Sequence, residues 1–94
     1  MDQRYDDILA PIVNIIAENK EYILEKDGLS TNAKCKLALK SNNYFPKGDL
    51  ENLVIIPYKD GQRIEINLMS PIKITISLFS TTSGAAIAQE EIPV

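Results

Sequence analysis

The stretch RIEINLMSPIKITISL, residues 63–78, decides the fold class of this 94-residue chain. Within it, apolar side chains occupy every second position on either side of Ser70-Pro71. These apolar residues are Ile64, Ile66 and Leu68 before the break and Ile72, Ile74, Ile76 and Leu78 after it. A period of two is typical of β-strands with one buried face and one wet face. The stretch therefore predicts antiparallel strands over 63–69 and 72–80.

The break between these two strands is short and allows two interpretations. Ser70-Pro71 can close a tight hairpin between two separate strands. Alternatively, it is a bulge within one long bent strand. In either case Phe79 falls outside the inward-facing register of 72–78, so we expect its ring on the opposite face of the sheet.

Residues 33–40 repeat the alternation and predict another strand. Its apolar positions are Cys35, Leu37 and Leu39, and its polar positions include Lys34, Lys36 and Lys40. The three lysines are therefore expected to share the wet face of this strand. The following residues, 41–52, are rich in Asn, Pro, Gly and Asp and predict a loop.

Two more strands complete the expected sheet. The apolar run 53–58 is typical of a central strand or of one covered on both faces, and Pro57 implies that its position needs no ladder donor. Asp60-Gly61 is the residue pair that a type I′ hairpin turn prefers, so 53–58 should pair with 63–69. An alanine-rich segment, 85–92, predicts a fifth strand that ends before Pro93.

Residues 3–26 predict one N-terminal helix, because their apolar residues recur at spacings of three and four. Asp2 is a candidate N-cap, and Asp27-Gly28 is a stop signal. Pro11 leaves two interpretations open: it starts a helix near Ala10, or it kinks a longer one. A third interpretation makes 21–25 a strand.

The expected fold is therefore α+β: an N-terminal α-helix packed on a four- to five-stranded antiparallel meander sheet. The chain length and the absence of a linker indicate a single domain over 1–94.

The composition argues against catalysis and metal binding. The chain has no histidine, which is the commonest general base and metal ligand. Its single cysteine, Cys35, cannot form an internal disulfide and is expected to be a buried thiol in a reducing compartment. We expect no enzymatic activity, no catalytic residues, no metal and no cofactor.

Charge and hydropathy narrow the expected partners and location. The net charge of -3 argues against capture of nucleic acid. No apolar run approaches the roughly 20 residues of a membrane helix, and no secretory signal is visible. A cytoplasmic protein is expected, and its richness in Ile, Lys and Asn, whose codons are AT-rich, suggests a bacterial or viral source.

One set of residues forms the candidate ligand or partner surface. It combines the lysine-faced strand with aromatic residues expected outside the core: Lys34, Lys36, Lys40, Tyr44, Phe45 and Phe79. A competing interpretation treats these lysines as a solvated face that blocks unwanted strand pairing.

The leading hypothesis is a small non-enzymatic protein-binding module, an adaptor, inhibitor or assembly component, that acts as a homo-oligomer. It rests on the missing catalytic residues and on a sheet that one helix covers only in part. The alternative is a binder of a small anionic ligand or nucleotide, which uses the lysines and the aromatic loop that follows them.

Overall fold

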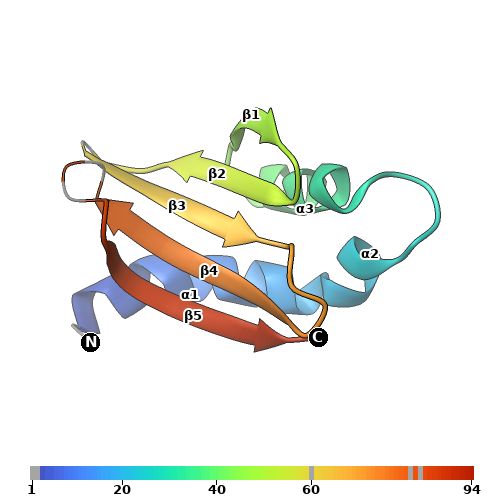
Figure 1. Ribbon diagram of the computed structural model, residues 1–94, viewed down its shortest axis with the longest axis horizontal. Helices are drawn as coiled ribbons and strands as arrows, with labels where there is room; N and C mark the ends of the chain where they lie inside the picture. The colour runs from blue at the N-terminus through green and yellow to red at the C-terminus, as the bar shows by residue number, and fades with distance from the viewer. Residues whose placement is uncertain (1–2, 60, 81, 83) are drawn as a thin grey trace.

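The computed structural model describes residues 3–59, 61–80, 82 and 84–94, and these residues form three helices and five strands. The elements in chain order are α1 (Gln3–Glu18), α2 (Lys20–Leu24), α3 (Thr31–Lys40), β1 (Lys47–Leu50), β2 (Leu53–Pro57), β3 (Gln62–Asn67), β4 (Lys73–Ser80) and β5 (Ala86–Pro93). The strands form one antiparallel sheet in the order β1-β2-β3-β4-β5 (Figure 1). The expected α+β class with an antiparallel meander is confirmed.

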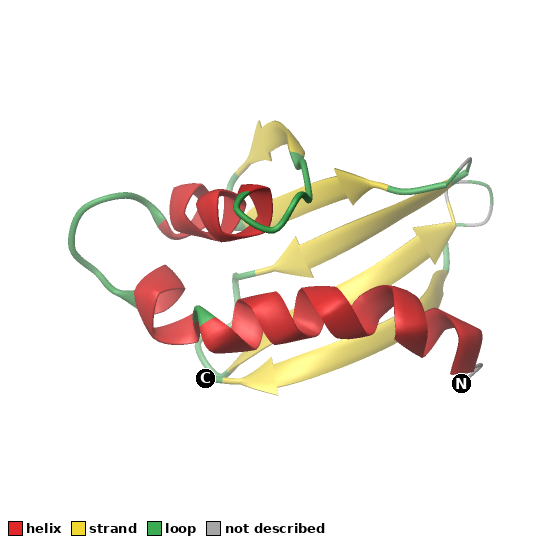
Figure 2. Cartoon of the chain, turned by 180° about the vertical axis from the view of Figure 1, so that it is seen from behind, coloured by secondary structure: helices red, strands yellow, loops and turns green. Residues whose placement is uncertain are grey.

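All three helices lie on one side of the sheet, as the front and back views agree (Figures 1 and 2). Helix α1 crosses β4 and β5, and α3 lies over the β2 end of the sheet. The short helix α2 connects them and contacts both. The sheet therefore has one covered face and one face that no helix of the described chain covers. We call the second face the open face.

The hydrophobic core fills the space between the helices and the covered face. Alternate residues of β2, β3 and β4 point into it, as the period of two predicts. The buried apolar residues are Leu9, Ile12, Ile15, Ile16, Ile23, Cys35, Ala38, Leu39, Val54, Ile56, Ile64, Ile66, Leu68, Ile74, Ile76, Leu78, Ala88 and Ile92. Burying each isoleucine or leucine contributes about 1.5–3 kcal/mol, so this layer is the main source of stability.

The prediction of a strand over 33–40 is wrong, because these residues form helix α3. Ser30 caps the helix: its hydroxyl oxygen accepts a 3.1 Å hydrogen bond from the amide of Ala33. The segment consists largely of Ala, Lys and Leu, which are strong helix formers. Its buried residues, Cys35, Ala38 and Leu39, recur at spacings of three and four, whereas Leu37 is 44% exposed.

The loop expected over 41–52 contains the first strand of the sheet. Strand β1 pairs with β2 between Lys47 and Ile55 and between Leu50 and Leu53, with an irregular register between these pairs. Gly48 has a positive φ of 76° within this short strand. Such a strand has no apolar alternation, so the period of two could not reveal it.

The N-terminal helix is divided in two, so the prediction of one helix over 3–26 is wrong. Pro11 lies inside α1, which excludes a helix that begins near Ala10. The division falls at Asn19, whose side-chain amide donates to the Ile15 carbonyl at 2.8 Å. Such a bond competes with regular helix propagation.

Helix α2 ends at Leu24, earlier than expected, and Glu25 is already extended, with φ −58° and ψ 135°. The strand interpretation of 21–25 is also wrong. The expected N-cap, Asp2, lies outside the described residues.

The hairpin interpretation of Ser70-Pro71 is confirmed, since β3 and β4 are separate paired strands. Both are shorter than expected because the turn between them spans 68–72, where two side chains accept hydrogen bonds from backbone amides. Asn67 Oδ1 accepts from the amide of Met69 at 2.9 Å, and Ser70 Oγ accepts from the amide of Ile72 at 3.2 Å. Ile72 belongs to this turn, is 70% exposed and lies outside β4, contrary to the expected register.

The expected pairing of 53–58 with 63–69 is confirmed, within shorter bounds, by the antiparallel ladder of β2 and β3. The type I′ geometry proposed for Asp60-Gly61 falls on Asp60, which lies outside the described residues. Strand β5 begins at Ala86 and includes Pro93, so the expected 85–92 is displaced by one residue at each end.

Candidate functional site

The structure does not bring the six predicted surface residues together. Lys34 is buried, and Tyr44 packs against the core. Lys36 and Lys40 lie on α3, whereas Phe79 belongs to β4. Phe45 is 64% exposed in the segment that links α3 to β1. The single surface expected from a lysine-faced strand therefore does not exist, because that strand is a helix.

Lys34 was expected on a wet face, but only 2% of it is exposed. Its ammonium donates a hydrogen bond to the Glu25 carbonyl and lies 5.6 Å from the centroid of the Tyr22 ring. Glu25 is the C-cap of α2, so the ammonium meets the carbonyl-rich end of that helix. Lys34 thus fixes the connection between α2 and α3 and is not available to a ligand.

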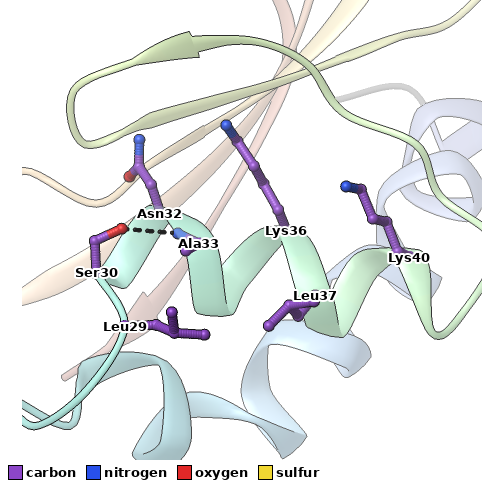
Figure 3. A pocket seen from close by; sticks show the side chains of 7 residues that line it. All are labelled: Leu29, Ser30, Asn32, Ala33, Lys36, Leu37 and Lys40. Carbon is purple, nitrogen blue, oxygen red and sulfur yellow. Dashed lines mark hydrogen bonds between the residues drawn. The ribbon is translucent and has the colours of Figure 1, made fainter.

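Helix α3 lines a surface hollow of about 440 Å³ (Figure 3). Its lining residues are Leu29, Ser30, Asn32, Ala33, Lys36, Leu37 and Lys40. Leu29 and Leu37 lie on one side of the helix in this view, and Lys36 and Lys40 extend on the other. We call this region the α3 hollow. The two lysines thus line one side of the hollow and the two leucines line the other.

Two side chains of the α3 hollow also hold strand β1 in place. Lys36 Nζ donates to the Gly48 carbonyl at 3.0 Å, and Asn32 Nδ2 donates to the Leu50 carbonyl. Asn32 Oδ1 is buried and has no hydrogen-bond partner within the described part of the chain. The hollow is therefore built on a helix whose neighbouring strand is fixed by side-chain hydrogen bonds.

The open face of the sheet carries side chains from the positions that alternate with the core residues. Phe79 lies opposite Arg63 in the β3–β4 ladder, and the Arg63 guanidinium is 4.9 Å from its ring centroid. Arg63 Nε also pairs with Glu65 Oε2 at 2.6 Å. The alternating pattern of β2 places Leu53 and Ile55 here, both half-buried. This face thus combines an apolar part with paired charges.

The free edge of β5 is poorly suited to strand pairing. The Val94 amide donates to the Ile72 carbonyl, so by alternation the Gln89, Glu91 and Pro93 backbones face away from β4. Pro93 has no amide donor, and its carbonyl accepts from Lys20 Nζ at 2.9 Å.

Glu90 further protects this edge. It pairs with Ile76 in the β4–β5 ladder, which is a covered-face position, and it lines a small hollow beside α1 with Ala10, Val13 and Asn14. An inward-pointing charge, a proline and a lysine cap are features that protect edge strands. At the opposite edge, β1 has only four residues.

Pro57 lies at a position that needs no backbone hydrogen-bond donor, as its place in the sequence predicts. The Tyr58 amide donates to the Gln62 carbonyl, so the Pro57 nitrogen faces away from β3. The β1 ladder reaches only as far as Ile55, and no donor is needed at Pro57.

The thiol of Cys35 has the properties of a structural residue. Burial raises its pKa from 9.0 to about 12, with the charge of Lys36 acting in the opposite direction. Among the described residues, no group of three or more His, Cys, Asp or Glu side chains could hold a metal ion. No helix in the described ranges is long and apolar enough to cross a membrane.

Sequence reasoning missed the α3 hollow because it assigned the wrong secondary structure to 33–40. The signal that could have found it is Ser30, a preferred N-cap residue placed directly before a run of helix formers. On a helix, Lys36 and Lys40 share one face and Leu37 does not belong to the buried set.

Comparison with known proteins assigns no family to this chain: no protein-family model matches it, and no curated protein or solved structure is significantly similar to it.

Proposed function

We propose that this protein is a small non-enzymatic protein-binding module, an adaptor, inhibitor or assembly component, that self-associates through the open face of its sheet. One observation carries the proposal: all the helices of the described chain lie on one side of the sheet (Figure 2). The open face has half-buried apolar side chains, Leu53, Ile55 and Phe79, that no helix covers. Uncovered apolar surface of this kind is typical of interaction sites.

The charges on the open face favour a second copy as the partner. Arg63 pairs with Glu65, and Lys73 Nζ pairs with Glu91 Oε2 at 2.6 Å, so these charges are balanced within each copy. Two open faces can therefore meet with little net repulsion, although the whole chain carries -3. The protected β5 edge directs association to the face and away from strand pairing.

The size of the sheet sets the expected strength of this contact. The longest strands, β4 and β5, have eight residues each. The five strands together contain 31 residues, so at about 3.3 Å per residue and about 4.8 Å between strands the face offers roughly 500 Å² per copy. Stable complexes bury about 800 Å² per partner. The proposed dimer is therefore weak and depends on protein concentration.

Sedimentation equilibrium over a range of protein concentrations tests the proposal. The wild-type mass should rise toward twice the chain mass, whereas Ile55→Arg should remain monomeric because it adds an unpaired charge to the contact. Ile72→Arg is the matched control, since Ile72 is 70% exposed in the β3–β4 turn and lies outside the sheet. A wild-type chain that stays monomeric at millimolar concentration would refute self-association.

A second candidate function, binding of a small anionic ligand, is favoured by one observation. Lys36 and Lys40 line the same hollow, one helical turn apart. Lys34 and Tyr44 take no part in it, since both face the interior. Titration with inorganic phosphate, followed by the amide signals of α3, tests this candidate; unchanged signals would exclude it.

A further inference from the structure

The chain has a pronounced charge asymmetry centred on α3. Residues 29–48 contain four lysines and no acidic residue, whereas the rest of the chain contains six basic and thirteen acidic residues. Of the four lysines, Lys34 is buried and Lys36 and Lys40 line the α3 hollow. Acidic residues do flank the segment, with Asp27 before it and Asp49 after it. The α3 hollow is therefore a local basic site on an acidic protein.

The apolar part of the α3 hollow distinguishes it from an ordinary basic surface. Leu29 is 55% exposed and Leu37 is 44% exposed, and both line the hollow. Binding sites are concave, largely apolar spaces of about 300–1,000 Å³ with a few polar groups that fix orientation. At about 440 Å³, the hollow has room for one or two side chains of a partner.

We propose that the α3 hollow docks an acidic segment of a partner protein, with one apolar side chain against Leu29 and Leu37 and carboxylates beside Lys36 and Lys40. The argument is charge complementarity combined with exposed leucine surface. The site is separate from the open face, so the inference goes beyond self-association and holds whether or not two copies pair.

The spacing of the two lysines fits a peptide. They are separated by one helical turn, which corresponds to about 6 Å along the axis of α3. In an extended peptide, side chains two residues apart are separated by about 6.6 Å. Two carboxylates at alternate positions of such a segment can therefore lie beside Lys40 and beside Lys36, whose ammonium also donates to the Gly48 carbonyl.

Other anionic occupants fit the hollow less well. An inorganic anion would use the lysines but leave both leucines exposed to water. Nucleic-acid binding uses aromatic rings for base stacking, and the lining of the hollow contains no aromatic residue.

The test is a titration of the isotopically labelled full chain with the peptide GSDELEDSG, followed by amide chemical shifts. We expect shifts that map to α3 and to Leu29. The peptide GSDESEDSG, which lacks the apolar anchor, and the peptide GSNQLQNSG, which lacks the charges, should each bind at least about tenfold more weakly.

Matched variants separate a specific site from bulk charge. Lys40→Glu should weaken binding of GSDELEDSG by about tenfold or more, and Lys40→Gln should weaken it less. Lys59→Glu makes the same charge change at an exposed position in the β2–β3 hairpin and should leave binding nearly unchanged. Circular dichroism of each variant verifies folding.

Three results would overturn the inference: no shift at α3 with millimolar peptide, an equal loss in Lys59→Glu, or equal occupancy of the hollow by inorganic phosphate. The last result would identify the small-anion site of the second candidate function. None of these results depends on the monomer–dimer equilibrium measured for the open face, so the two proposals fail independently.

Discussion

At the scale of single residues, Lys34 shows how tertiary contacts can reverse the expected role of a side chain. The pattern of 33–40 predicts a solvated lysine, but the fold places its stem in the interior and its ammonium on the Glu25 carbonyl. Lysine is rarely buried without a partner for its charge. Here the partners are a helix C-terminus and the face of the Tyr22 ring.

Replacing Lys34 should therefore destabilise the fold. Lys34→Ala leaves a cavity and a carbonyl without its donor, and should lower the free energy of unfolding by about 2–4 kcal/mol. Lys34→Met keeps most of the side-chain volume and should lower the free energy of unfolding by less than Lys34→Ala does. Urea denaturation measures both, and Lys40→Ala is the control because Lys40 is exposed on the same helix. Equal midpoints for Lys34→Ala and Lys40→Ala would contradict this account.

Burial of the Cys35 thiol predicts a pH-dependent stability. Its pKa is about 12 in the folded state and 9.0 ordinarily, so the folded chain keeps the proton that the unfolded chain loses between these values. The unfolded state is favoured progressively as pH rises above 9, by up to about 1.4 kcal/mol per pH unit, and the effect is absent below pH 9.

The comparison of wild type with Cys35→Ala isolates this effect, because lysines and tyrosines titrate in both proteins. The difference in unfolding free energy between them should narrow by about 1 kcal/mol between pH 8 and pH 10. Guanidinium denaturation at both pH values measures this difference. If the difference in unfolding free energy is the same at pH 8 and pH 10, the thiol does not contribute to the pH dependence of stability.

At the scale of elements, α3 is the segment on which the candidate site depends. Two of its alternating apolar residues, Cys35 and Leu39, also match a helical spacing together with Ala38. The choice between strand and helix is made by the cap and by packing against α1, α2 and β2. Because α3 is a helix, Lys34 points inward while Lys36 and Lys40 line the hollow.

The Ser30 cap should contribute measurably to the stability of helix α3. Ser30→Ala removes the acceptor for the Ala33 amide and should cost about 1 kcal/mol of stability. Ser30→Asp preserves a capping oxygen and places a negative charge at the helix N-terminus, so it should restore stability. Thermal and urea denaturation of wild type, Ser30→Ala and Ser30→Asp should show that Ser30→Ala is the least stable of the three. Equal losses in both variants would mean that the cap itself is unimportant.

At the scale of the whole molecule, the placement of helices divides the surface into distinct regions. The covered face holds the core, the open face is free of helices in the described chain, and the β5 edge is protected by Glu90, Pro93 and Lys20. The α3 hollow lies on the helical side (Figure 3). Two independent association surfaces are thus possible on one small molecule.

The sequence by itself determined the four strands β2–β5, their antiparallel order and the amphipathic character of α1. These features depend on local periodicity, because one buried face forces apolar residues to recur every second residue in a strand and every third or fourth in a helix. Phe79 was placed correctly for the same reason, since its register follows directly from its neighbours.

Only the tertiary structure decided the identity of 33–40, the existence of β1 and the position of Lys34. Cys35 and Leu39 fit both periods. Strand β1 is held by pairing with β2 and by hydrogen bonds from α3 side chains, and the burial of Lys34 requires Tyr22 of α2 and its C-cap residue Glu25. Burial and strand pairing depend on groups that are distant in the chain, so they cannot be derived from a local pattern.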